Sequence, residues 1–137
     1  MTVRGIQWLL AVVFWTLGGW CLLFPQSVLN LAIQPGYQSN APIVPILVGC
    51  FGAQAMIAGL FAAFSRFTAT TFVAFGIGLM PFFAFDYWFF ARVPVLTPLG
   101  LVDALGNLAM LCLCFAGWRA ARTETGPPPP SSTSPPP

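Results

Sequence analysis

The chain has 137 residues, of which 58% are hydrophobic and 6% are charged. Soluble domains carry about 25% charged residues, so this chain has too few of them to cover a surface that faces water. Five basic residues, all arginine, oppose three acids for a net charge of +2, which excludes the clustered positive charge of a nucleic-acid-binding surface, and the absence of histidine removes the commonest metal ligand and acid–base catalyst.

Four windows are long and apolar enough to cross a membrane as helices, because a span needs about 20 mostly apolar residues. The first window is longer than the apolar region of a signal peptide, which is about 7–15 residues, and it leads into a proline, so we expect it to be retained. The four expected spans cover approximately residues 7–24, 43–64, 68–90 and 98–118.

The segments between the windows predict how the helices are connected. Residues 25–42 carry no charge and predict a short helix that lies in the membrane interface between the first two spans. The other two connections, 65–67 and 91–97, are short, which favours antiparallel neighbours. Pro81 predicts a kink in the third span. Thr97 followed by proline is typical of a helix start, because Thr caps the N-terminus and proline fits the first turn.

The sequence therefore predicts an all-α polytopic membrane protein, an antiparallel bundle of four transmembrane helices over residues 1–122. The composition then changes abruptly, and residues 123–137 are rich in proline and serine. Such a segment cannot bury apolar area, so it predicts a disordered cytoplasmic tail.

Arginines predict the orientation, because cytoplasmic loops carry an excess of positive charge. In a four-span arrangement Arg92 falls alone on the outer side. The other four fall together on the inner side, which places both termini in the cytoplasm: Arg4, Arg66, Arg119 and Arg122.

Two aspartates lie inside the expected spans. Asp86 and Asp103 are predicted at similar depths, roughly 6–8 Å below the outer surface at about 1.5 Å per residue. Because a carboxylate in a span is costly, we expect Arg92 to fold down and bridge both. Asn107 follows Asp103 by one helical turn on the same face, and Gln54 lies near the middle of the second span.

These polar residues allow two interpretations. In one, Gln54, Asp86, Asp103 and Asn107 line a polar pocket that opens to the outer side. In the other, they form interhelical hydrogen bonds that hold the bundle together, each worth about 0.6 kcal/mol.

Small residues at four-residue spacing predict helix-packing faces, because they let helix backbones approach closely in lipid. The expected packing positions are Gly49, Ala53, Ala55, Gly59, Ala63, Ala74, Gly78, Gly100 and Ala104.

Cysteine usage favours packing over chemistry. Cys112 and Cys114 form a CxC pair, not the CxxC of redox or zinc motifs, and all four cysteines lie in apolar runs. The sequence has no phosphate-binding loop and no nucleophile paired with a base. We therefore assign no catalytic residue and no metal ligand, and expect no cofactor, although a lipid or quinone is compatible with the polar pocket.

Between Gly52 and Met80 the chain resembles small DoxX-like membrane proteins. The likeness rests on a Gly-rich second span with Gly59 and Leu60, followed by a short turn that contains Arg66. The resemblance implies a four-helix bundle in a bacterial inner membrane, and it carries over no functional residues.

From the sequence we expect a small integral membrane protein without catalytic activity of its own. It would act as an accessory or structural subunit in a larger membrane complex or homo-oligomer, surrounded by membrane lipid. One alternative is a small transporter or a lipid- or quinone-binding protein that uses the outer polar pocket. Another is a membrane enzyme of lipid or redox metabolism.

Overall fold

The computed structural model describes residues 2–124, so the expected tail at 123–137 lies almost entirely outside the described residues. The described part is helical, and its regular elements are α1 (Val3–Leu23), α2 (Pro25–Ala32), a 3-10 turn (Pro35–Tyr37), α3 (Ile43–Phe64), α4 (Ala69–Gly78), α5 (Met80–Tyr87), a π-helical turn (Trp88–Arg92), a second 3-10 turn (Pro98–Gly100) and α6 (Leu101–Glu124).

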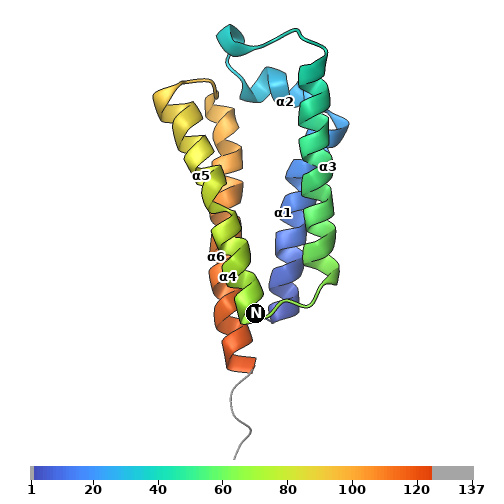
Figure 1. Cartoon of the computed structure of the whole chain (residues 1–137), viewed down its shortest axis with the longest axis vertical. Coiled ribbons are helices and arrows are strands. Elements are labelled where there is room, and N and C mark those ends of the chain that lie inside the picture. The colour runs from blue at the N-terminus through green and yellow to red at the C-terminus, as the bar shows by residue number, and fades with distance from the viewer. Residues whose placement is uncertain (1, 125–137) are drawn as a thin grey trace, which may run out of the picture.

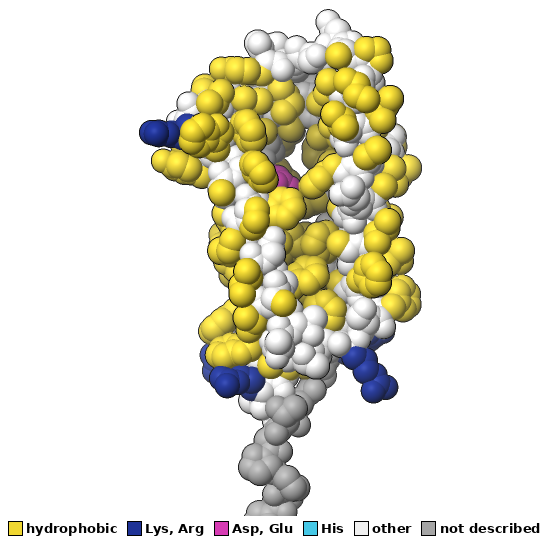
Figure 2. All heavy atoms as spheres, in the orientation of Figure 1, with side chains coloured by type: hydrophobic (Ala, Val, Ile, Leu, Met, Phe, Trp, Pro, Cys, Tyr) yellow, Lys and Arg dark blue, Asp and Glu magenta, His cyan; other side chains and the backbone are white. Residues whose placement is uncertain are grey.

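Four helical stretches in this part of the chain are long and apolar enough to cross a membrane. Large apolar side chains are exposed along all of them, and Figure 2 shows them covering the visible face of the molecule. A helix that is apolar all round suits a lipid environment. The predicted all-helical class with four such helices is therefore confirmed; the four stretches are Val3–Leu23, Ile43–Phe64, Ala69–Arg92 and Pro98–Thr123.

The helices associate in two groups, α1 with α3 and α6 with α4 and α5, and α1 also packs against α6 (Figure 1). Glycines bring α1 and α3 together. A Cβ atom at Gly52 would lie 2.6 Å from the carbonyl oxygen of Gly18, so the two backbones touch. Close approach of this kind is the normal means of helix association in lipid.

The third expected span is broken at Leu79, between α4 and α5. Pro81 has no N–H to donate to the carbonyl of Ile77, one turn earlier, which removes a helical hydrogen bond at this point. The amide of Leu79 keeps its helical bond to the carbonyl of Phe75 and also reaches that of Gly76, at 3.2 Å each, so the last turn of α4 is tightened. The expected kink is therefore present, and Figure 1 shows α5 leaning away from the α1–α3 pair.

The packed core lies in the half of the molecule where α1 begins. Phe72 is fully buried, and its ring centroid is 5.1 Å from that of Phe67. Gln7 is 3% exposed, and its amide nitrogen donates to the carbonyls of Ala62 at 3.1 Å and Ser65 at 2.7 Å, which ties the start of α1 to the end of α3. The other half of the molecule is hollow.

Candidate functional site

A cavity of about 910 Å³ separates the α1–α3 pair from α5 and α6 in the half of the molecule that carries α2. Figure 2 shows the surface hollowed between the two groups, with an acidic side chain inside the hollow. Ligand pockets in proteins span about 300–1,000 Å³, so the space is large enough for a small molecule. Its walls are mostly apolar, and the polar exceptions include Gln54, Thr71, Asp86, Asp103 and Asn107.

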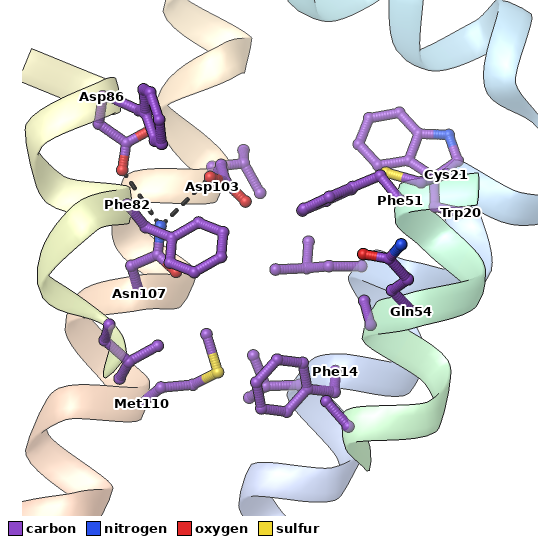
Figure 3. Close-up of a pocket in the computed structure, with 18 of the residues that line it drawn as sticks. Phe14, Trp20, Cys21, Phe51, Gln54, Phe82, Asp86, Asp103, Asn107 and Met110 are labelled. Carbon is purple, nitrogen blue, oxygen red and sulfur yellow. Dashed lines mark hydrogen bonds between the residues drawn. The ribbon is translucent and has the colours of Figure 1, made fainter. Parts of the chain in front are cut away.

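Asp86, Asp103 and Asn107 meet on one wall of this cavity (Figure 3). The amide nitrogen of Asn107 donates to Oδ2 of Asp86 at 3.1 Å and to Oδ2 of Asp103 at 3.2 Å. Asp103 and Asn107 share a face of α6 because they are four residues apart, and Asp86 reaches them from α5. Asn107 is 3% exposed, whereas both aspartates are only half-buried. Asn107 therefore joins two acids that belong to different helices.

Arg92 does not bridge the aspartates, contrary to the sequence-based expectation. Its side chain is exposed, and within residues 2–124 neither Asp86 nor Asp103 forms an ion pair. Arg92 lies six residues after Asp86, in a π-helical turn, so it is on a different side of the helix. A guanidinium group also keeps its hydration when it stays at the surface. The amide of Asn107 takes the place that we expected Arg92 to fill.

Gln54 lies on the opposite wall, on α3 (Figure 3). Its side-chain amide forms no hydrogen bond within the described residues. Phe51, one turn earlier on α3, faces Phe82 of α5 across the cavity, with 6.4 Å between ring centroids. Gln54 is therefore a cavity residue that lies apart from Asp86, Asp103 and Asn107.

The end of the cavity next to α2 is closed by a backbone clamp between α2 and the loop that precedes α6. Ile33 and Leu96 form an isolated β-bridge, and the amide of Gln34 donates to the carbonyl of Val95 at 2.8 Å. Thr97 donates from its hydroxyl to the carbonyl of Leu31 at 2.6 Å and accepts from the amide of Gly100 at 3.3 Å. The sequence did not predict the clamp, although it did predict that Thr97 caps the start of a helix.

Aromatic packing closes the other end of the cavity. Phe14 of α1 and Phe75 of α4 meet edge to face with 5.7 Å between ring centroids, and Met110 of α6 is 4% exposed beside them (Figure 3). The cavity is thus bounded along its length by the clamp at one end and by these rings at the other.

The small residues proposed for packing have different surroundings. Gly59 lies against Trp15, whose ring would be 2.6 Å from a Cβ at that position, and Gly100 lies against the carbonyl of Ala32. A Cβ at Gly49 or Gly78 would meet nothing within 4 Å. Ala63 is fully buried in the core, Ala55 and Ala74 line the cavity, and Ala53 and Ala104 are half-buried on α3 and α6.

The four cysteines are free thiols. Cys21 lines the cavity, Cys114 is buried, and Cys50 and Cys112 are exposed on apolar helices. Within the described residues, no three side chains of the types that bind metals are close enough to hold an ion. The chemistry that the site offers is therefore hydrogen bonding and charge, set in an apolar chamber.

Comparison with protein-family models, with curated proteins and with solved structures finds no match to this chain. The described residues form a helical protein with four helices long and apolar enough to cross a membrane, which is compatible with a multi-pass membrane protein.

Proposed function

We propose that this protein is an integral membrane protein that binds an elongated amphiphilic molecule, such as a membrane lipid, in the cavity between its two helix groups. Its four spans would form an antiparallel bundle in a bacterial inner membrane, with both termini in the cytoplasm and α2 in the outer interface. The single observation that carries the proposal is a cavity of about 910 Å³ with apolar walls and one strongly polar group of side chains.

The residues that line the cavity favour an amphiphile over a wholly polar solute. The apolar walls suit a hydrocarbon chain, whereas a wholly polar solute would lose its hydration there without replacement hydrogen bonds. Asp86, Asp103 and Asn107 form a polar anchor beside the clamped end. A molecule with a polar end and an apolar body matches this division.

The opening of the cavity supports entry from within the membrane. It lies between α3 and α5, on a side of the molecule that is covered with apolar side chains (Figure 2). The rings of Phe51 and Phe82 stand across it, and aromatic side chains in lipid can change rotamer without breaking hydrogen bonds. The amphiphile would slide between the two helix groups and would not have to cross water.

The same opening supports a second candidate, the accessory or structural subunit that we expected from the sequence. A partner, or a second copy of this chain, would then place a helix against α3 and α5 and fill the space with side chains. In this second candidate, the polar anchor would contact the partner and stabilise the complex.

The experiment is to measure the native mass of the gently extracted protein and to identify what copurifies. A lone protein or homo-oligomer that carries a bound amphiphile supports the proposed binding function. A fixed ratio to another protein, with no small molecule retained, refutes it and supports the accessory role.

Two matched variants locate the bound molecule. Ala58→Phe introduces a ring at a cavity-lining position and should expel the amphiphile, whereas Ile57→Phe introduces the same ring at a neighbouring position that is 52% exposed and does not line the cavity. Equal retention of the amphiphile by both variants would place its binding elsewhere.

A further inference from the structure

We propose that the amphiphile carries an ammonium group, and that the class of ligand is a long-chain amine whose N–H groups bind Asp86 and Asp103. This inference rests on the proposed binding function and specifies the head group that the site selects. It follows from which hydrogen-bonding atoms remain available in the cavity.

The polar anchor presents acceptors. A side-chain amide has two N–H groups, and those of Asn107 are both used, one for each aspartate. The atoms that remain are oxygens: Oδ1 of Asp86, Oδ1 of Asp103 and the amide oxygen of Asn107, none of which receives a hydrogen bond within residues 2–124. Asn107 as a whole is 3% exposed, lines the cavity, and has an amide oxygen that is not fully enclosed.

The charge of the anchor is not balanced by the chain. Carboxylates that ionise inside a largely apolar chamber need a cation, since buried charges are paired in stable structures. The sequence has no lysine or histidine, and Arg92, which we expected to serve, is exposed outside the cavity. A ligand that brings its own cation would complete the site.

Aromatic rings around the anchor suit a cation as well. Trp20, Phe51 and Phe82 line the cavity, and Figure 3 shows Phe82 beside Asn107, with Phe51 and Trp20 on the wall opposite the two acids. An ammonium group is attracted to the face of such rings. The carboxylates add directional acceptors, which favours a primary ammonium with its three N–H groups over a quaternary one.

The same atoms disfavour other amphiphiles. A carboxylate or phosphate head would bring negative charge towards two carboxylates, and like charges placed together cost several kcal/mol. A quinone ends in carbonyl oxygens, which accept hydrogen bonds and would meet only acceptors at the anchor, since the free N–H groups of Gln54 lie on the opposite wall. The quinone that the sequence left open is therefore the weaker candidate, and an alcohol is intermediate because it donates one hydrogen bond without a charge.

The test compares three probes of equal chain length, decylamine, decanol and decanoic acid, on the full-length protein in maltoside micelles. Binding is measured by native mass spectrometry. Because hydrogen bonds to charged groups contribute about 1.5–3 kcal/mol, the amine should bind at least about tenfold more tightly than the alcohol, and the acid most weakly. Equal binding of the three probes, or a preference for decanoic acid, would overturn the inference and leave the proposed function intact.

Two variants then test whether the polar anchor causes the preference for the amine over the alcohol. The double variant Asp86→Asn/Asp103→Asn keeps the shape of both side chains and should lose about tenfold or more in affinity for decylamine, while its affinity for decanol changes by less than about threefold. Decanol binding therefore reports whether the variant still folds. Arg92→Gln alters one charge near the same end but outside the cavity, and should leave the preference for the amine in place.

Two results separate failure of this inference from failure of the proposed function. If the double variant binds decylamine as well as the wild type does, the anchor does not select the head group and the inference is wrong. If none of the three probes binds to the wild-type protein, the binding function itself fails and the inference falls with it.

Discussion

The contact between Gly18 and Gly52 leads to a sharp prediction about stability. A Cβ atom at position 52 would lie 2.6 Å from the carbonyl oxygen of Gly18 and 2.9 Å from the carbonyl carbon of Cys21. Both are backbone atoms, so neither can move aside as a side chain would. The substitution Gly52→Ala must therefore push α1 and α3 apart along the interface that they share.

The expected size of the effect combines two opposite terms. Overpacking of this kind costs about 1–3 kcal/mol. Alanine is also a better helix former than glycine by about 1 kcal/mol, which offsets part of that cost. Gly49→Ala is the matched control, because it lies one turn earlier on α3 and a Cβ there would meet nothing within 4 Å. The two variants should therefore differ in unfolding free energy by about 1–3 kcal/mol, with Gly52→Ala the less stable.

The assay is unfolding of the purified protein in mixed maltoside and dodecyl sulfate micelles, followed by circular dichroism. Gly49→Ala should unfold at the same dodecyl sulfate fraction as the wild type or a slightly higher one, and Gly52→Ala at a lower one. If Gly52→Ala were as stable as Gly49→Ala, α1 and α3 would not touch at this point, and the proposed arrangement of the helix groups would be wrong.

Two further predictions test contacts of Gln7 and Thr97, and a third tests the proposed orientation. Gln7→Leu should lower the unfolding free energy by about 1 kcal/mol, since one buried and one partly buried carbonyl lose their donor. Gln26→Leu, on the exposed surface of α2, should have no effect in the same assay. Thr97→Val should speed amide hydrogen exchange along α2, because the clamp loses the hydroxyl that binds Leu31; unchanged exchange, as expected for the control Thr16→Val, would contradict a closing role for the clamp. A reporter that is active only in the cytoplasm should be active when fused to the C-terminus, because four of the five arginines lie at the span ends that we propose to face the cytoplasm. Activity of a reporter that works only outside the cytoplasm would reverse the proposed orientation.

Sequence reasoning reached the membrane spans because their signal is carried by composition over about 20 residues and needs no knowledge of packing. It also placed Asp86 near Asp103 and Asn107, since equal depth in neighbouring spans and a four-residue spacing are properties of helices. The break at Leu79 followed from the chemistry of Pro81.

The features that sequence reasoning missed depend on atoms far apart in the chain. That the amide of Asn107 points at both carboxylates depends on how α5 and α6 pack, so Arg92 was the natural choice of bridge on charge alone. The clamp uses backbone groups of Gln34 and Val95, which every residue type provides. Gln7 lies near the end of a span, where a polar residue is unremarkable, and its partners are more than fifty residues away.

A comparison of Gln7 with Asp86 and Asp103 supports a binding role for the two aspartates. The side chain of Gln7 is 3% exposed, and its amide nitrogen donates to two backbone carbonyls in the packed half of the molecule, away from the cavity. Asp86 and Asp103 are half-buried, keep free acceptor atoms and line the hollow half. A bundle that needed polar residues only to hold its helices would bury them as it buries Gln7. The contrast within one small protein therefore favours a ligand as the missing partner of the two acids.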